Sequence, residues 1–234
     1  QKKITGSFTA DTHGSRSSGR GRASTLININ SALHMGETIT FQNVYTYGSN
    51  YYSLGVSGPI GYKGVTASLR GSVMDYDLGT PLKSTEPQGD SKELSLSLNF
   101  PTITYNNLTA SINFGASFNE YLNRTTSGIT SEKTNLKSNL DINLGIVDNF
   151  LGGGLNTISL SFAHGEIDLG DNRSDLNSDS TTAKTQGNYE KIGLNFSRTQ
   201  ILNDRNSLFF STNGQYGFKN LDSAEQISLG GVNN

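Results

Sequence analysis

The chain of 234 residues is 33% hydrophobic with a mean hydropathy of -0.44, which is low for a packed globular core of this size. Its 18 lysines and arginines face 20 acidic residues, so no basic field is available to hold nucleic acid, and the absence of cysteine excludes disulfides and thiolate chemistry. No stretch approaches the run of about 18 apolar residues that a spanning helix needs. The 27 glycines, few prolines and many Ser, Thr and Asn residues indicate an all-β chain.

Apolar residues recur at every second position, in segments of about ten residues, along the whole chain. The predicted strands, in chain order, span about residues 2–11, 20–32, 37–47, 51–58, 63–77, 92–100, 107–121, 132–147, 155–167, 188–198 and 206–218. Short turns alternate with longer polar loops, the longest being expected at about 78–91, 122–131 and 168–187. This alternation is typical of bacterial outer-membrane barrels.

The two faces of the predicted strands differ in polarity. Residues 92–100, for example, place Leu94 and Leu96 on one face and Glu93 and Ser95 on the other. A basic side chain at the bilayer midplane would cost about 2–4 kcal/mol, and the mid-strand charges fall on the polar face. The residues that we predict to face a hydrated lumen are Arg70, Lys137, Asn139, Asp141 and Asn143.

A soluble antiparallel sheet with one solvated face would show the same alternation. Long strands, a polar face of Ser, Thr and Asn, and tyrosines near strand ends favour the membrane instead. These tyrosines are Tyr45, Tyr47, Tyr51, Tyr52, Tyr76, Tyr121 and Tyr216. We therefore predict an antiparallel transmembrane β-barrel. Bacterial single-chain barrels have even strand numbers, so about eleven strands indicate an incomplete one whose closing strands lie beyond residue 234.

No arrangement of residues predicts catalysis. The three histidines, His13, His34 and His164, lie in separate turns or near strand ends, without a second ligand at metal-binding spacing. The loop from Asp168 to Asp179 is rich in carboxylates but lacks the regular spacing of a calcium loop, so a solvated loop is favoured and Ca²⁺ binding stays open. We expect no enzyme activity and no cofactor.

Three segments resemble one family. The tail, Asp222-Ser-Ala-Glu-Gln-Ile-Ser-Leu-Gly-Gly-Val-Asn-Asn234, resembles the segment that leads into the Val-Arg-Gly-Tyr/Phe loop of two-partner secretion transporters, the haemolysin and filamentous-haemagglutinin secretion/activation family. Residues 11–22, Asp-Thr-His-Gly-Ser-Arg-Ser-Ser-Gly-Arg-Gly-Arg, look like the end of that family's first strand and the start of its second. Residues 48–61 are similar to its fourth strand and the turn that follows.

The resemblance implies an outer-membrane transporter of a Gram-negative bacterium, which exports a large, unfolded client protein without ATP. Its barrel has 16 strands, so residues 1–234 would be the N-terminal part of the barrel domain, without the last strands and the periplasmic POTRA domains. In the family, the loop after strand eleven folds back into the barrel. The residues that would begin this inward loop are Glu225, Gln226, Leu229, Gly230, Gly231, Asn233 and Asn234.

Two other functions remain open at this stage. One is a barrel-assembly insertase of the same superfamily, and the other is a soluble or surface-displayed β-rich adhesin. The expected partners of a transporter are the secreted client and outer-membrane lipid, with no nucleic acid. Nothing in the sequence identifies the client.

Overall fold

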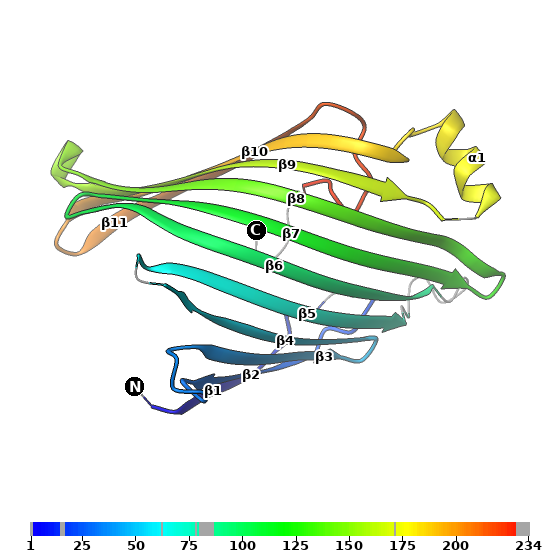
Figure 1. Ribbon diagram of the computed structural model, residues 1–234, viewed down its shortest axis with the longest axis horizontal. Coiled ribbons are helices and arrows are strands. Elements are labelled where there is room, and N and C mark those ends of the chain that lie inside the picture. The colour runs from blue at the N-terminus through cyan, green and yellow to red at the C-terminus, as the bar shows by residue number, and fades with distance from the viewer. Residues whose placement is uncertain are drawn as a thin grey trace.

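The computed structural model describes residues 2–14, 17–61, 63–77, 79, 87–170 and 172–227, and these form one antiparallel sheet (Figure 1). The described strands are β1 (Ile4–Asp11), β2 (Arg22–Asn30), β3 (Thr38–Thr46), β4 (Ser49–Ile60), β5 (Val65–Asp77), β6 (Gln88–Tyr105), β7 (Leu108–Thr125), β8 (Gly128–Asp148), β9 (Gly154–Asp168), β10 (Gly187–Asn203) and β11 (Asn206–Gly217). A 3-10 turn η1 (Phe150–Gly152) and a helix α1 (Arg173–Thr181) interrupt the series. The prediction of an antiparallel all-β fold with eleven strands is confirmed.

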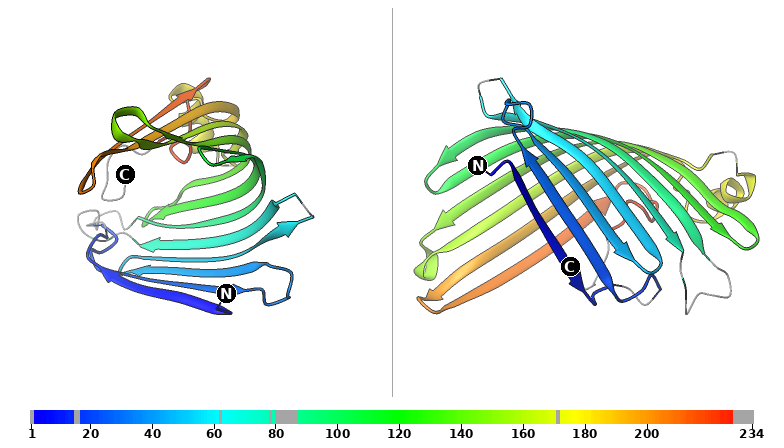
Figure 2. Two further views of the ribbon diagram at one scale, coloured as in Figure 1. Left: turned by 90° about the vertical axis from the view of Figure 1, so that its left-hand side faces the viewer. Right: turned by 90° about the horizontal axis from the view of Figure 1, so that it is seen from below.

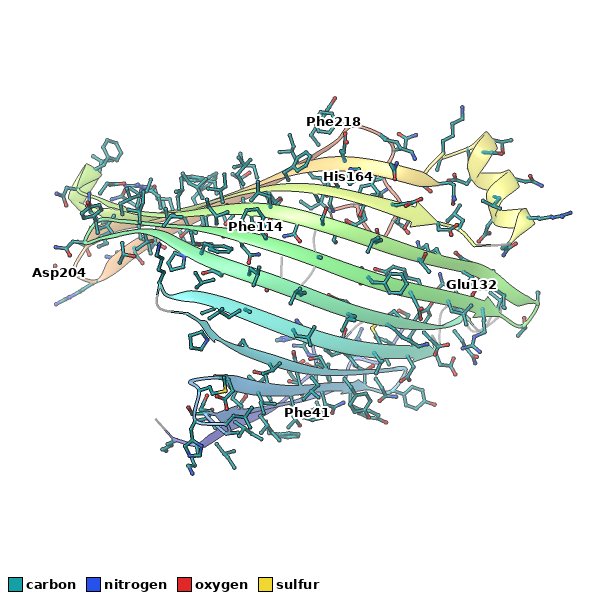
Figure 3. The ribbon with its side chains drawn as sticks, in the orientation of Figure 1. Phe41, Phe114, Glu132, His164, Asp204 and Phe218 are labelled. Carbon is teal, nitrogen blue, oxygen red and sulfur yellow. The ribbon has the colours of Figure 1, made fainter. Side chains whose placement is uncertain are left out.

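The sheet is an open, curved wall. Each described strand pairs with its neighbours in sequence, and no described ladder joins β1 to β11. Figure 2 shows the sheet bending into a trough with these two strands at its edges, so it has a concave inner face and a convex outer face. The rim that carries α1 is called the loop rim, and the rim that carries η1 is called the turn rim. Glu132 and Asp204 mark these opposite ends (Figure 3).

The strand register assigns each side chain to one face, because residues directly opposite each other project to the same side. One row on the inner face runs through Gly55, Arg70, Ser95, Ser117, Lys137, Gly165 and Tyr189. The neighbouring row on the outer face runs through Leu54, Gly71, Leu94, Phe118 and Leu136. The side chains of the inner row are therefore mostly polar, whereas those of the outer row are apolar.

The outer face has the dimensions of a lipid-facing surface. Leu54, Leu94 and Leu136 are 59%, 56% and 58% exposed, and side chains of this kind cover a continuous area. Soluble proteins rarely expose so large an apolar surface to water. On β8 the apolar outer residues run from Leu136 to Ile146. At about 3.3 Å per residue and a strand tilt of about 40°, these ten steps span about 25 Å, the height of the apolar band of an outer-membrane barrel.

Several ion pairs stand on the outer face towards the ends of this band, among them His164–Glu190 at 3.5 Å. Lys92 and Glu120 pair at 3.5 Å towards the loop rim. Arg198 and Asp148 pair at 2.6 Å towards the turn rim, where the guanidinium also donates to Asn156 and Gln200. The sequence prediction placed mid-strand charges on the polar face. These charges lie on the outer face instead, because the strands extend beyond the apolar band, where either face meets polar surroundings.

The predicted loop at 122–131 is wrong. β7 continues to Thr125 and β8 begins at Gly128, so a two-residue turn replaces a ten-residue loop. The predicted loop at 78–91 likewise gives its last residues to β6, which starts at Gln88. Strands that leave the membrane are polar on both faces, so the alternation that marks a spanning strand is absent there although the ladder continues.

A small apolar core closes the inner face at the loop rim. Ile167, Leu169 and Tyr189 are buried, and Leu176 of α1 and Leu221 of the chain after β11 pack against them. Asn172 caps α1, with its side chain accepting from the backbone of Ser174 and Asp175. Within the described residues, no helix has both the length and the apolarity that crossing a membrane requires.

Candidate functional site

After β11 the chain stays in contact with the sheet. Residues 218–227, here called the returning segment, turn back along the inner face beneath β8, β9 and β10 (Figures 1 and 2). The turn is fixed at its start, where the backbone N–H of Phe218 donates to the carbonyl of Glu190 at 3.0 Å. The carboxyl-terminal part of the described chain is thereby placed inside the trough rather than at its edge.

Glu225 is the centre of the contact between the returning segment and the wall. Its side chain is only 3% exposed, and its carboxylate lies 2.9 Å from the ammonium nitrogen of Lys137 and 2.6 Å from that of Lys191. The side-chain amide of Asn135 donates to the same carboxylate at 2.6 Å. Because Lys137 stands on β8 and Lys191 on β10, one carboxylate bridges two strands across β9.

The wall also binds the backbone of the returning segment. The Lys191 ammonium and the Gln215 side-chain amide both donate to the Glu225 carbonyl at 2.9 Å. The Gln215 side-chain oxygen accepts the backbone N–H of Ile227 at 2.9 Å. Gln215 therefore holds the backbone of the returning segment by a donor and an acceptor at once, just after the turn that the Glu225 N–H closes by donating to the Asp222 carbonyl at 2.9 Å.

A second ion pair holds the segment nearer the loop rim. The Lys133 ammonium lies 2.5 Å from the Asp222 carboxylate and 5.5 Å from the centre of the Tyr121 ring. Lys219 of the segment donates to the carbonyl of Gln186 at 2.5 Å, in the connection between α1 and β10. Both side chains of the Lys133 pair are largely buried, so this contact is weakly screened by salt.

Tyr189 and Gly165 set the floor of the site. The Tyr189 hydroxyl donates to the side-chain oxygen of Asn135 at 3.0 Å, and this orients the Asn135 amide towards Glu225. Asn135 is fully buried. A Cβ atom at Gly165 would lie 2.5 Å from the Tyr189 hydroxyl oxygen, so only glycine lets the tyrosine ring lie across β9.

The electrostatics of the site keep Glu225 ionised. Burial alone would raise the pKa of this carboxyl, but the hydrogen bond from Lys191 and the charge of Lys137 outweigh it, and the pKa is lowered. A buried carboxylate between two ammonium groups is stable only while all three are present. The contacts of Glu225 with Lys137, Lys191 and Asn135, together with those of the Lys133–Asp222 pair and of Tyr189 and Gln215, are here called the latch. Its strength depends on charge.

The structure brings together only some of the residues predicted from sequence. Glu225 meets Lys137, whereas Gln226 donates to the carbonyl of Leu221 at 2.8 Å within the segment itself. The remaining residues predicted to begin the inward loop, Leu229, Gly230, Gly231, Asn233 and Asn234, lie outside the described residues.

The other residues predicted to face the lumen lie on the inner face but away from the segment. Asp141 accepts from Asn139 at 2.6 Å, and Asn143 accepts from the Ser159 hydroxyl at 2.8 Å. Arg70 stands on β5 and donates to the Tyr51 hydroxyl. They form a polar wall rather than part of the latch.

Five residues of the latch were missed by the sequence prediction: Lys133, Asn135, Tyr189, Lys191 and Gln215. Lys133 and Asn135 have the same parity along β8 as Lys137, so alternation assigns them to the polar face. Nothing local distinguishes them from the other polar residues there, because their partners come from the returning segment.

The predicted loop at 168–187 is wrong in part, because the helix α1 lies within it, and the Asp-rich segment is held by hydrogen bonds to its own backbone. Asp179 accepts from the backbone N–H groups of Thr185 at 2.8 Å and Gln186 at 3.0 Å, and Asp168 accepts from that of Gly170 at 3.1 Å. Burial raises the pKa of Asp179, but these hydrogen bonds outweigh it and lower the pKa overall. Among the residues that the structure describes, no three histidine or acidic side chains are grouped to hold a metal ion.

The sequence matches the family model described as haemolysin secretion/activation protein ShlB/FhaC/HecB over residues 1–234. The chain belongs to this family. It is a family of secretion proteins rather than of enzymes, and the chain is a β-barrel protein of the Gram-negative outer membrane. No match to a curated protein was found.

Solved structures share the fold. CdiB from Escherichia coli superposes with a TM-score of 0.81 at 19% identity, over 99% of this chain and 44% of that one. CdiB from Acinetobacter baumannii gives 0.72 at 15% identity, over 99% and 42%. BamA from Haemophilus ducreyi, solved without POTRA domains 1–3, gives 0.57 at 16% identity, over 99% and 45%. The chain therefore spans less than half the length of these structures, which at such identities establish the fold alone.

Proposed function

We propose that the full-length protein exports a large secreted partner across the outer membrane, in unfolded form and without ATP. The family to which the chain belongs is one of haemolysin secretion and activation, and this supports a secreted client protein as the partner. On this proposal residues 1–234 are the N-terminal part of the barrel domain, with further strands and POTRA domains elsewhere in the protein.

The observation that carries the proposal is the latch on the inner face. A segment of chain without regular secondary structure lies along the wall and is held there through its carboxylates and its backbone. A face that holds polypeptide through its backbone and its charges suits the path of an unfolded client. Asn139, Asp141 and Asn143 of β8 would then line the hydrated part of this path.

The outer face completes the proposal with lipid as the second partner. Its apolar band of about 25 Å fits the hydrocarbon of an outer membrane. The balance of 18 basic and 20 acidic residues gives no support to nucleic acid as a partner. The exposed apolar face likewise argues against the soluble adhesin considered from sequence.

Secretion of the client tests the proposal. In a Gram-negative host that makes the client and the full-length protein, the client is expected in the medium, and Glu225→Lys is expected to reduce its amount because a third ammonium group would then face Lys137 and Lys191. Arg70→Gln, on the same face but away from the latch, is the matched control. Secretion that continues without the full-length protein would refute the proposal.

The same cells separate transport from barrel assembly. If the protein were an insertase, its loss would lower the amounts of other outer-membrane barrels while the client's export failed only as a consequence. The match to a secretion/activation family favours transport.

A further inference from the structure

The wall of the latch carries more positive charge than the segment that covers it. Among the described residues, Lys133, Lys137 and Lys191 point from β8 and β10 to the returning segment, which offers them two carboxylates, Asp222 and Glu225. The three lysines are spread along the direction of the segment. They would remain as a row of ammonium groups on the inner face if the segment left.

The wall binds the returning segment through two kinds of contact, one to its side chains and one to its backbone. The lysines and Asn135 recognise carboxylates, which is specific for acidic side chains. Gln215 recognises the backbone through the Glu225 carbonyl and the Ile227 N–H, groups that any peptide can supply. Together these contacts define a site for a peptide with acidic residues three positions apart, as Asp222 and Glu225 are in the turn of the returning segment.

The site has room beside the segment. A cavity of about 300 Å³ is bordered by Lys137, Lys191, Asn195 and Gln215 as well as by the segment itself. Ser161, Gly193 and Gly214 also border it, so the wall contributes no large apolar side chain to its lining. Such a surface accepts a peptide without requiring particular apolar side chains.

We propose that Lys133, Lys137, Lys191 and Gln215 form a binding site for acidic segments of the translocating polypeptide, and that the returning segment is its built-in competitor. An acidic stretch of the client displaces Asp222 and Glu225 and takes over their contacts with the wall. The site is then covered while no client is present. This inference rests on the proposed export function for its occupant, but binding can be measured without export.

The competition predicts weak binding in the native protein. A tethered ligand acts at an effective concentration in the millimolar range, so a free acidic peptide must overcome it. The returning segment is this tethered ligand. Weakening its contacts with the wall reduces the competition, so the affinity for an acidic peptide rises. Removing the lysines that both ligands share abolishes the gain.

Fluorescence anisotropy of rhodamine-labelled peptides on the full-length protein in detergent tests the inference. The probes are the acidic repeat (Glu-Ser-Gly)4 and the neutral repeat (Gln-Ser-Gly)4. Glu225→Gln is expected to raise the affinity for the acidic peptide at least tenfold, with no effect on the neutral peptide. Adding Lys137→Gln and Lys191→Gln to that variant is expected to remove the gain.

Arg70→Gln in the Glu225→Gln background is the matched control, since it removes one positive charge from the same row of the inner face, three strands from Lys137. It is expected to keep the gain. An equal loss in this control, equal binding of the neutral peptide, or no gain in Glu225→Gln would each overturn the inference.

Folding of each variant is checked by its heat-modifiable migration in electrophoresis. Should Glu225→Gln not fold, Asp222→Asn frees Lys133 alone and is expected to raise the affinity for the acidic peptide by a smaller factor; an unchanged affinity would overturn the inference. Failure of peptide binding with normal secretion of the client would reject the site and leave the proposed export function intact.

Discussion

Replacing Glu225 by glutamine removes the charge at the centre of the latch while keeping the shape of the side chain. Removing one partner of a fully buried ion pair costs about 3–5 kcal/mol. The Lys137 and Lys191 side chains keep 26% and 18% of their exposure, so water solvates them in part. We therefore expect the docked state of the returning segment to lose about 2–3 kcal/mol. At about 1.4 kcal/mol per tenfold change, this is a shift of about 30- to 150-fold in the docking equilibrium.

Hydrogen exchange of residues 218–227 in the full-length protein measures this shift. The backbone N–H group of Ile227 donates to the Gln215 side chain of β11 only while the segment is docked, so its exchange follows the opening equilibrium. Exchange is expected to accelerate by the same 30- to 150-fold. Arg70→Gln is expected to leave it unchanged. An acceleration below about threefold in Glu225→Gln would refute the electrostatic basis of the latch.

Three further predictions concern residues around the latch and the turn rim. Gly165→Ala is expected to destabilise the docked segment by about 1–3 kcal/mol, because its Cβ would displace Tyr189; Gly71→Ala, whose nearest neighbour is 3.9 Å away, is the control in the same exchange measurement. Since the contacts with Lys191 and Lys137 lower the pKa of Glu225, the charge of this residue stabilises the docked state above its ordinary pKa, and this contribution is lost as pH falls through the lowered pKa of the docked state. A spin label on the returning segment is expected to gain mobility in that acidic range, and Glu225→Gln is expected to remove the pH dependence. Arg198→Lys is expected to lower the midpoint of thermal unfolding, because the three donors on one lysine nitrogen cannot replace the five hydrogen bonds that the planar guanidinium makes; an unchanged midpoint would show that this outer-face cluster does not stabilise the turn rim.

The strands and their faces follow from local sequence. Leu94 and Glu93 lie on opposite faces as alternation predicts, because the side-chain period of a strand is two and needs no knowledge of the partner strand. The loop predicted at 122–131 failed for the same reason. Alternation marks the part of a strand that crosses lipid, and it stops at the membrane boundary although β7 and β8 continue to pair.

The returning segment was expected only through its resemblance to a family, since Glu225 in isolation is one acidic residue in a polar tail. Its contacts with Lys137 and Lys191 join residues 88 and 34 positions apart, and Asn135 is 90 positions away. No local pattern distinguishes these partners from Asn139 or Asp141, which share the same face of β8.

The sequence by itself determined the number of strands, the polarity of each face and the placement of lipid outside, since these depend on the period of the strand and on the free energy of burying charge in hydrocarbon. Only the tertiary structure decided which polar residues of the inner face act together. Register aligns Lys137 with Gly165 and Tyr189 across three strands, and the curvature of the sheet brings the chain after β11 back over them. A carboxylate and two ammonium groups then meet in a buried place, where their attraction is strong because little water remains to screen it.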